Sequence, residues 1–127
     1  MPLVRIDVPM GRSPEKRRII ADVIYDAMIA TLNVPQNDRF QIISEHESHD
    51  LIIDPTYLGI ERTHAAIIIQ VTLNEGRSVE VKQSFYKAVA EGLRDRAGMR
   101  PEDVFISLVE VKKENWSFGN GVAQYAT

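Results

Sequence analysis

The amino-acid sequence repeats itself weakly at an offset of 65 residues, and this repeat constrains the fold more than any other feature. A Gly-Arg-Ser-x-Glu pattern occurs twice, and an aspartate, a phenylalanine and a glutamate further along recur at the same offset. The shared offset and order predict two copies of one structural unit, at about residues 2–45 and 66–111 of a single domain spanning residues 1–127. The matched pairs are Gly11 and Gly76, Arg12 and Arg77, Ser13 and Ser78, Glu15 and Glu80, Asp38 and Asp103, Phe40 and Phe105, and Glu45 and Glu110.

The first copy has the pattern of a strand, a turn, a helix and a second strand. Apolar residues occupy every second position of residues 4–8, as in a half-buried strand. Ser13 is a favourable helix N-cap and Pro14 suits the first helical position. Apolar residues then recur at helical spacing until Asn33, and residues 40–43 have the composition of a strand.

The second copy repeats this plan with strands at residues 67–73 and 104–111, and residues 112–127 form a C-terminal turn. A β-α-β unit pairs its strands in parallel through a right-handed crossover. We therefore predict an α/β fold in which duplicated β-α-β units form a four-stranded mixed sheet with two helices on one face. The other face stays uncovered, so we expect the chain to form a homo-oligomer.

The composition excludes several classes of function. The net charge is −3 and no dense basic stripe occurs, so no nucleic-acid partner is expected. The absence of cysteine excludes disulfides, thiol catalysis and zinc–thiolate sites. The longest apolar run, residues 65–69, is too short to cross a membrane, and no signal peptide is evident. We expect a cytoplasmic protein without a membrane partner.

Pro2 directly follows the initiator Met1 at the head of the first strand. Removal of Met1 would give the chain a secondary amine fixed at the end of a rigid strand. Burial or nearby cations lower the pKa of such an amine and a carboxylate raises it, so it can act as a base or as a cation near pH 7. The counterpart of Pro2 in the second copy is Ile67, which has no free amine, so we predict one reactive corner per chain.

Arg77 is the candidate group for binding an anion at that corner. If the two inner strands are antiparallel, the turn that holds Arg77 lies near Pro2, whereas its counterpart Arg12 faces continuous backbone. A guanidinium binds a carboxylate through two parallel hydrogen bonds, so the pairing predicts a small carboxylic acid as substrate. The alternative is that Arg77 is a solvated surface arginine.

Asp38, Trp116 and Phe118 are further candidates for the site. Asp38 could keep the amine of Pro2 protonated or orient a water molecule, although its counterpart Asp103 is explained by turn chemistry alone. Trp116 and Phe118 in the tail could exclude water from a small substrate, or they could simply cover the exposed sheet edge.

A metal or another cofactor is not expected. His46 and His49 lie among acidic residues at a spacing that fits one helical face, but no helical periodicity supports a helix there. Further ligands are also unassigned, so we predict no metal site. No phosphate-binding loop, dinucleotide fingerprint or nucleophile elbow occurs in the sequence.

Several short motifs together resemble the tautomerase superfamily, and most closely its malonate semialdehyde decarboxylase-like branch. The resemblance covers nearly the whole chain, and it depends on the order and spacing of the motifs. The motifs are Pro2-Leu3, residues 34–41 (Val-Pro-Gln-Asn-Asp-Arg-Phe-Gln), Leu58-Gly59, Phe85-Tyr86-Lys87 and residues 115–119 (Asn-Trp-Ser-Phe-Gly).

This resemblance implies a homotrimer in which Pro2 is the catalytic group after removal of Met1. It implies that Asp38 activates water or assists the amine, and that Arg77 is one of two arginines that bind the carboxylate and polarise the carbonyl. Trp116 and Phe118 match aromatic residues of the pocket wall. One departure is clear, because the second arginine of the decarboxylase pattern is replaced by Glu75 in a loop that is one residue longer.

The sequence therefore predicts an N-terminal-proline enzyme that acts on small oxo acids without a cofactor. The leading hypothesis is keto–enol tautomerisation, with Pro2 as acid and base and Arg77 as carboxylate clamp. The alternatives within the same site are a malonate semialdehyde decarboxylase or a hydratase that uses Pro2, Asp38 and Arg77. A hypothesis of another class is a non-catalytic trimeric binding module.

Overall fold

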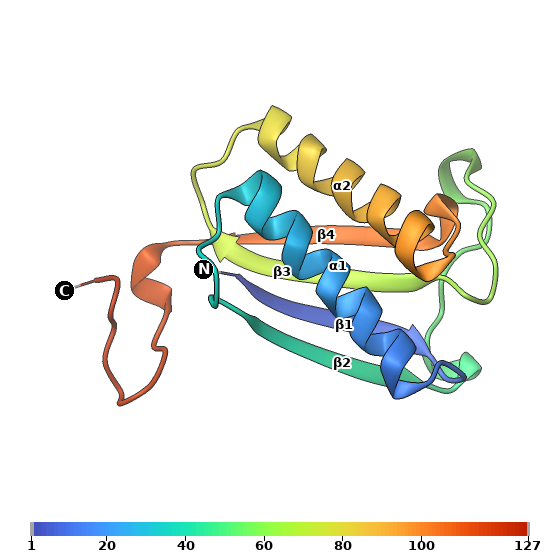
Figure 1. Ribbon diagram of the computed structural model, residues 1–127, viewed down its shortest axis with the longest axis horizontal. Coiled ribbons are helices and arrows are strands. Elements are labelled where there is room, and N and C mark those ends of the chain that lie inside the picture. The colour runs from blue at the N-terminus through green and yellow to red at the C-terminus, as the bar shows by residue number, and fades with distance from the viewer. Residues whose placement is uncertain (1, 127) are drawn as a thin grey trace.

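The computed structural model describes residues 2–126 and contains one four-stranded sheet with two helices on one of its faces (Figure 1). The strand order is β2-β1-β3-β4. Each crossover joins a parallel pair, β1 with β2 and β3 with β4, and the inner strands β1 and β3 are antiparallel. The predicted fold class is confirmed. The elements are β1 (Leu3–Pro9), α1 (Pro14–Leu32), β2 (Phe40–His46), β3 (Ile67–Asn74), α2 (Val79–Ala97) and β4 (Val104–Val111).

The two units of the internal repeat share their helix lengths, helix caps and one ion pair. Both helices have 19 residues and begin at the same place in their unit. The hydroxyl of Ser13 accepts from the Lys16 N–H at 3.2 Å, and that of Ser78 accepts from the Val81 N–H at 3.2 Å. Both helices end at a left-handed residue. An ion pair also recurs at the same offset, as Arg17–Glu45 at 3.1 Å and Lys82–Glu110 at 2.9 Å.

The hydrophobic core lies between the helices and the sheet. Alternate residues of β1 and β3 point toward the helices and are buried, and for β1 the period of two in the sequence predicted this. The helices approach closely at Gly92 of α2, where an added Cβ would lie 2.7 Å from Cγ1 of Val23 in α1. The absence of a side chain at residue 92 therefore sets the distance between the two helices.

The opposite face of the sheet is open and partly apolar. Phe40 and Ile42 of β2 and Phe105 and Val109 of β4 are between 39% and 48% exposed on this face. Ile68 of β3 is only half-buried there. The expectation that one chain leaves this face uncovered is met, and such a patch is typical of a surface that contacts another protein.

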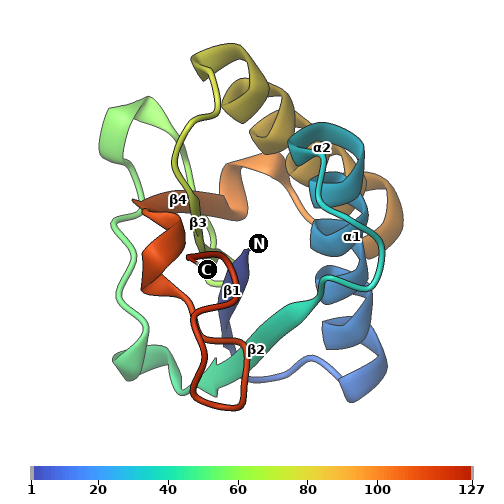
Figure 2. The ribbon, with the colours of Figure 1, turned by 90° about the vertical axis from the view of Figure 1, so that its left-hand side faces the viewer.

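The two irregular segments lie at opposite ends of the sheet (Figure 1). The linker between β2 and β3 contains the short 3₁₀ helices η1 (Ser48–Asp50) and η2 (Tyr57–Gly59). The tail after β4 begins with η4 (Lys113–Asn115) and turns back across the end where β1 starts (Figure 2). Neither α1 nor α2, nor any shorter helix within residues 2–126, is long and apolar enough to cross a membrane.

Candidate active site

A pocket of about 320 Å³ opens at the start of β1 and contains three of the predicted site residues. Pro2 is buried and contributes to its lining, together with Leu3, Phe40 and residues 115–118 of the tail. A pocket of about 370 Å³ at the linker end is lined by none of the predicted site residues. Of these two pockets, only the one at Pro2 contains predicted site residues.

The wall of this pocket is a group of stacked aromatic rings. Trp116 and Phe118 stack with centroids 5.5 Å apart and planes 13° apart. The Phe118 ring also lies 6.1 Å from Phe40 of the edge strand β2 and makes an edge contact with Tyr125 at 5.0 Å. The two roles considered for the tail aromatics, covering the edge of the sheet and lining the pocket, are thus combined in one cluster.

Asp38 lies buried in the turn before β2, with 8% of its surface exposed. Two residues later, Phe40 pairs with Leu3, so the turn is beside the beginning of β1. The Asn37 N–H donates to the hydroxyl of Tyr25 at 2.8 Å, which fixes the turn against α1. Burial raises the pKa of the Asp38 carboxyl, and the positive charge of the chain's amino terminus lowers it by a smaller amount.

Tyr125 is a further candidate for the site that sequence reasoning missed. Burial raises the pKa of its phenol, and the charge of Asp38 raises that pKa further, so the two side chains lie within electrostatic reach of each other. Its ring belongs to the aromatic cluster through Phe118. The only signal in the sequence was a third aromatic residue in the tail, nine positions after Trp116.

Arg77 follows β3 and is at the same end of the sheet as Pro2, as the antiparallel inner strands predicted. Its Nε and Nη2 donate to the Leu32 carbonyl at 3.3 and 3.0 Å, and its Nη1 donates to the Asn74 carbonyl at 3.1 Å. Helix α1 has no basic residue in its last turn, so Arg77 supplies the positive charge at the negative end of the helix dipole. Arg77 is therefore a fixed, half-buried group and not a freely solvated one, although it is not among the residues that line the pocket.

The corresponding corner of the second unit has a different arrangement. Arg12 donates to the Ala65 carbonyl at 2.9 Å, so it does face continuous backbone. Asp103 accepts from the Thr63 N–H at 2.7 Å and from the Thr63 hydroxyl at 2.6 Å. Thr63 of the linker thus supplies two hydrogen-bond donors to the carboxylate of Asp103. Asp38, at the same position of the first unit, lies buried in the turn beside the start of β1.

The pKa shift of Asp38 and the hydrogen bonds of Asp103 predict different effects of the same substitution in the two units. The raised pKa of Asp38 means that folding favours its protonated form. In an unfolded chain the pKa of an aspartate is about 3.9. The stability that Asp38 contributes is therefore lost as the pH rises from that value through the higher pKa of the folded state. Asp38→Asn should therefore leave the protein at least as stable at pH 7. Asp103→Asn should lower the free energy of unfolding by about 1–3 kcal/mol, because it weakens two buried hydrogen bonds. Urea unfolding of both variants measures the difference, and equal destabilisation would contradict this account.

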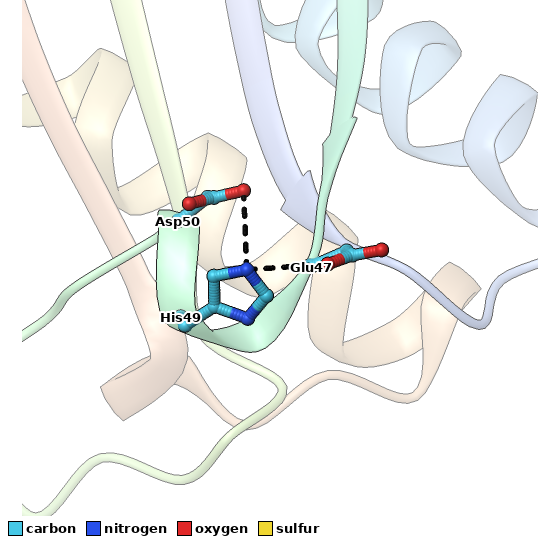
Figure 3. Close-up of side chains that lie close together, drawn as sticks. All are labelled: Glu47, His49 and Asp50. Carbon is cyan, nitrogen blue, oxygen red and sulfur yellow. Dashed lines mark ion pairs between the residues drawn. The ribbon is translucent and has the colours of Figure 1, made fainter.

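The acidic and histidine residues of the linker form a surface cluster (Figure 3). His49 lies 3.2 Å from Glu47 and 3.6 Å from Asp50, and all three side chains are exposed. His46 is separate from them and contacts Asp7 at 2.7 Å on the open face of the sheet. Exposed pairs of this kind contribute roughly 0–1 kcal/mol each. The two histidines grouped by their spacing in the sequence thus belong to different contacts.

Comparisons with known proteins identify the family of this fold. Residues 38–119 match a family described as tautomerase enzyme, and residues 2–60 match a second family of the same description. The chain belongs to the tautomerase family. It is therefore an enzyme of the isomerase type, and the resemblance found in its sequence is confirmed.

The similar proteins include both tautomerases and a decarboxylase. The probable tautomerase YusQ of Bacillus subtilis (strain 168) is 41% identical over 98% of both chains. The structure of FG41 malonate semialdehyde decarboxylase inhibited by 3-bromopropiolate is 42% identical, with a TM-score of 0.91, and the match covers 97% of this chain and 93% of that one. A fused 4-OT symmetric trimer has the same fold at 23% identity, with a TM-score of 0.79 and coverage of 98% of both chains.

Proposed function

We propose that the chain catalyses keto–enol tautomerisation of small oxo acids, with the amine of Pro2 as the group that moves the proton. The observation that carries the proposal is the position of Pro2, buried at an apolar pocket whose wall is formed by Trp116 and Phe118. Removal of Met1 is part of the proposal, because only then does the nitrogen of Pro2 carry a free lone pair. Asp38, buried in the turn beside the start of β1, is the acidic group that we propose sets the pKa of this amine.

The reaction requires one group that both accepts and donates a proton. The amine takes the proton of the enol hydroxyl, and the carbon–oxygen double bond forms as the electron pair of the carbon–carbon double bond moves to the α-carbon. The α-carbon then takes the proton back from the ammonium, so atoms and charge balance without an oxidant or a cofactor. An apolar wall supports this step, because exclusion of water strengthens the charge interactions of the amine.

Arg77 is proposed to bind the carboxylate of the substrate. A guanidinium has five N–H donors, and three of those of Arg77 are used in the hydrogen bonds to Leu32 and Asn74. One N–H on each Nη atom is left for a carboxylate. The contacts that fix the guanidinium also reduce the entropy that a flexible arginine would lose on binding.

Decarboxylation of a 3-oxo acid is the second candidate, and the identity of 42% to FG41 malonate semialdehyde decarboxylase favours it. In that reaction the bond to the carboxylate breaks, and its electron pair moves toward a carbonyl or an iminium that cationic Pro2 polarises or forms. Glu75, where the decarboxylase pattern has an arginine, is exposed and does not line the pocket. Its charge is therefore not a direct obstacle to an anionic substrate.

We further propose that the chain assembles as a homotrimer through the open face of its sheet. The exposed apolar residues of β2 and β4 support this, since a patch of this kind is a typical subunit contact. The fused 4-OT that shares the fold is a symmetric trimer.

The test is a pair of assays on one preparation whose intact mass shows that Met1 has been removed. Ketonisation of enol-phenylpyruvate measures tautomerisation, and carbon dioxide release from malonate semialdehyde measures decarboxylation. We expect fast ketonisation. Carbon dioxide release without ketonisation would favour the second candidate. No turnover of either compound by the intact oligomer with Met1 absent would favour a binding module and overturn the proposal.

A further inference from the structure

We infer that Asn74 is a positioning residue of the site, which holds the aromatic wall with its side chain and the arginine with its main chain. The inference rests on the proposed function, because it concerns the same pocket. It goes further by assigning a role to a residue that does not line the pocket and belongs to none of the sequence motifs.

Asn74 accepts one hydrogen bond with its side chain and another with its main chain. The indole Nε1–H of Trp116 donates to the side-chain Oδ1 of Asn74 at 2.7 Å. The guanidinium of Arg77 donates from Nη1 to the Asn74 carbonyl at 3.1 Å. One residue at the end of β3 is therefore bonded to both groups that are proposed to surround a substrate at Pro2.

The backbone of Asn74 is well placed to act as a fixed point. It is the last residue of β3 and pairs with Val111, the last residue of β4. The next residue, Glu75, donates its N–H to the Val111 carbonyl at 2.9 Å and thereby closes the end of the ladder. Groups held by rigid strands are located more accurately than groups on loops, and Trp116 itself lies on a loop.

The indole needs an anchor of this kind. Its N–H can only donate, and a half-buried donor that loses its acceptor incurs a desolvation cost. Stacking on Phe118 fixes the plane of the ring but leaves the ring free to slide within that plane. The hydrogen bond to Asn74 removes this freedom and sets the edge of the indole relative to Pro2.

The internal repeat shows that this anchor is specific to one corner of the fold. The residue at the corresponding position of the first unit is Pro9, which has no side-chain acceptor. Asn74 therefore occurs at the end of the sheet that has Pro2, Asp38 and Arg77, and is replaced at the end that has none of them. If residue 74 served only to end the strand, the two units would have no reason to differ at this position.

The first test uses the fluorescence of Trp116, the only tryptophan of the chain. Asn74→Leu has a similar size but no acceptor, and we expect a shifted emission maximum and about a twofold increase in acrylamide quenching as the indole moves. Asn74→Asp restores the acceptor and should restore the emission of the original protein. An unchanged emission in Asn74→Leu would overturn the inference, whether or not the protein turns over a substrate.

The second test is a double-mutant cycle on ketonisation with Trp116→Phe, which keeps a ring but has no N–H. Because the wall is proposed to contact the part of the substrate that does not react, Asn74→Leu should raise KM roughly tenfold with a smaller change in kcat. In the Trp116→Phe background, Asn74→Leu should add little further effect. Additive effects in the two backgrounds would show that Asn74 acts elsewhere.

The two tests separate this inference from the proposed function. Ketonisation that is absent in the unsubstituted protein overturns the proposed function, and the fluorescence experiment still decides whether Asn74 positions the wall. Thermal unfolding of each variant gives the control for global damage. A similar unfolding temperature with shifted emission supports a local displacement of Trp116.

Discussion

Replacement of Pro2 by alanine is expected to lower kcat/KM for ketonisation by roughly 10²–10⁴-fold, the range of a general acid–base group. The alanine variant still loses Met1 and keeps an amine, but that amine is primary and no longer held by a ring. Because Pro2 is buried at the pocket, a displaced nitrogen also loses its alignment with the enol. Steady-state rates with mass-verified termini measure the effect.

Pro9→Ala is the matched control, because Pro9 lies at the other end of the same strand. It should leave the rate of ketonisation within about twofold, since substitutions away from special features have small effects. An equal loss in both variants would mean that the strand, and not the amine, is responsible. A Pro2→Ala variant with unchanged kcat/KM would contradict the role of Pro2 in the reaction.

Replacement of Arg77 by alanine is expected to reduce both stability and substrate affinity. The three hydrogen bonds to Leu32 and Asn74 disappear, together with the positive charge that Arg77 places at the end of α1, which should lower the free energy of unfolding by about 1–2 kcal/mol. The loss of a carboxylate contact should raise KM by roughly 10- to 100-fold. Urea unfolding and steady-state kinetics measure the two effects separately.

The internal repeat again provides the control. Arg12 has the same place in the first unit and donates to the Ala65 carbonyl, far from Pro2. Arg12→Ala should therefore lower stability without changing KM. If Arg77→Ala and Arg12→Ala changed KM by the same factor, the effect of Arg77 would be one of stability, and its proposed contact with the substrate would be wrong.

The architecture of the chain could be predicted because the sequence contains it twice. Each weak local signal, such as Ser13 as a helix cap, has a second occurrence at Ser78. The placement of Arg77 at the same end of the sheet as Pro2 also followed from the sequence, because two β-α-β units joined at their inner strands leave few topologies. These inferences depend on local pattern and on connectivity, which a single sequence does show.

The contacts within the site could not be predicted in the same way. The hydrogen bonds from Arg77 to Leu32 and from Trp116 to Asn74 join residues that are more than 40 positions apart. The path of the tail decides that Tyr125 approaches Asp38, and a glycine-rich segment has no periodicity that would indicate its path. Such contacts result from tertiary packing, so spacing in the sequence has little bearing on them.

The same limit explains the histidines of the linker. Their spacing was that of one helical face, but His46 is the last residue of β2 and its side chain is directed to Asp7 on the open sheet face. His49 follows in a single 3₁₀ turn. Two residues three positions apart share a face only when both lie in one helix, and here a strand ends between them.

The central claim is that Pro2 has a reactive amine in a pocket that recognises a small acid, and labelling of that amine tests it most directly. The protein, with Met1 shown to be absent, is incubated with 3-bromopropiolate, the inhibitor in the structure of FG41 malonate semialdehyde decarboxylase. Peptide mass spectrometry then locates any adduct. The account predicts one adduct per chain, on Pro2, that forms in parallel with loss of ketonisation. An unmodified Pro2, or labelling spread over lysines with activity retained, would contradict it.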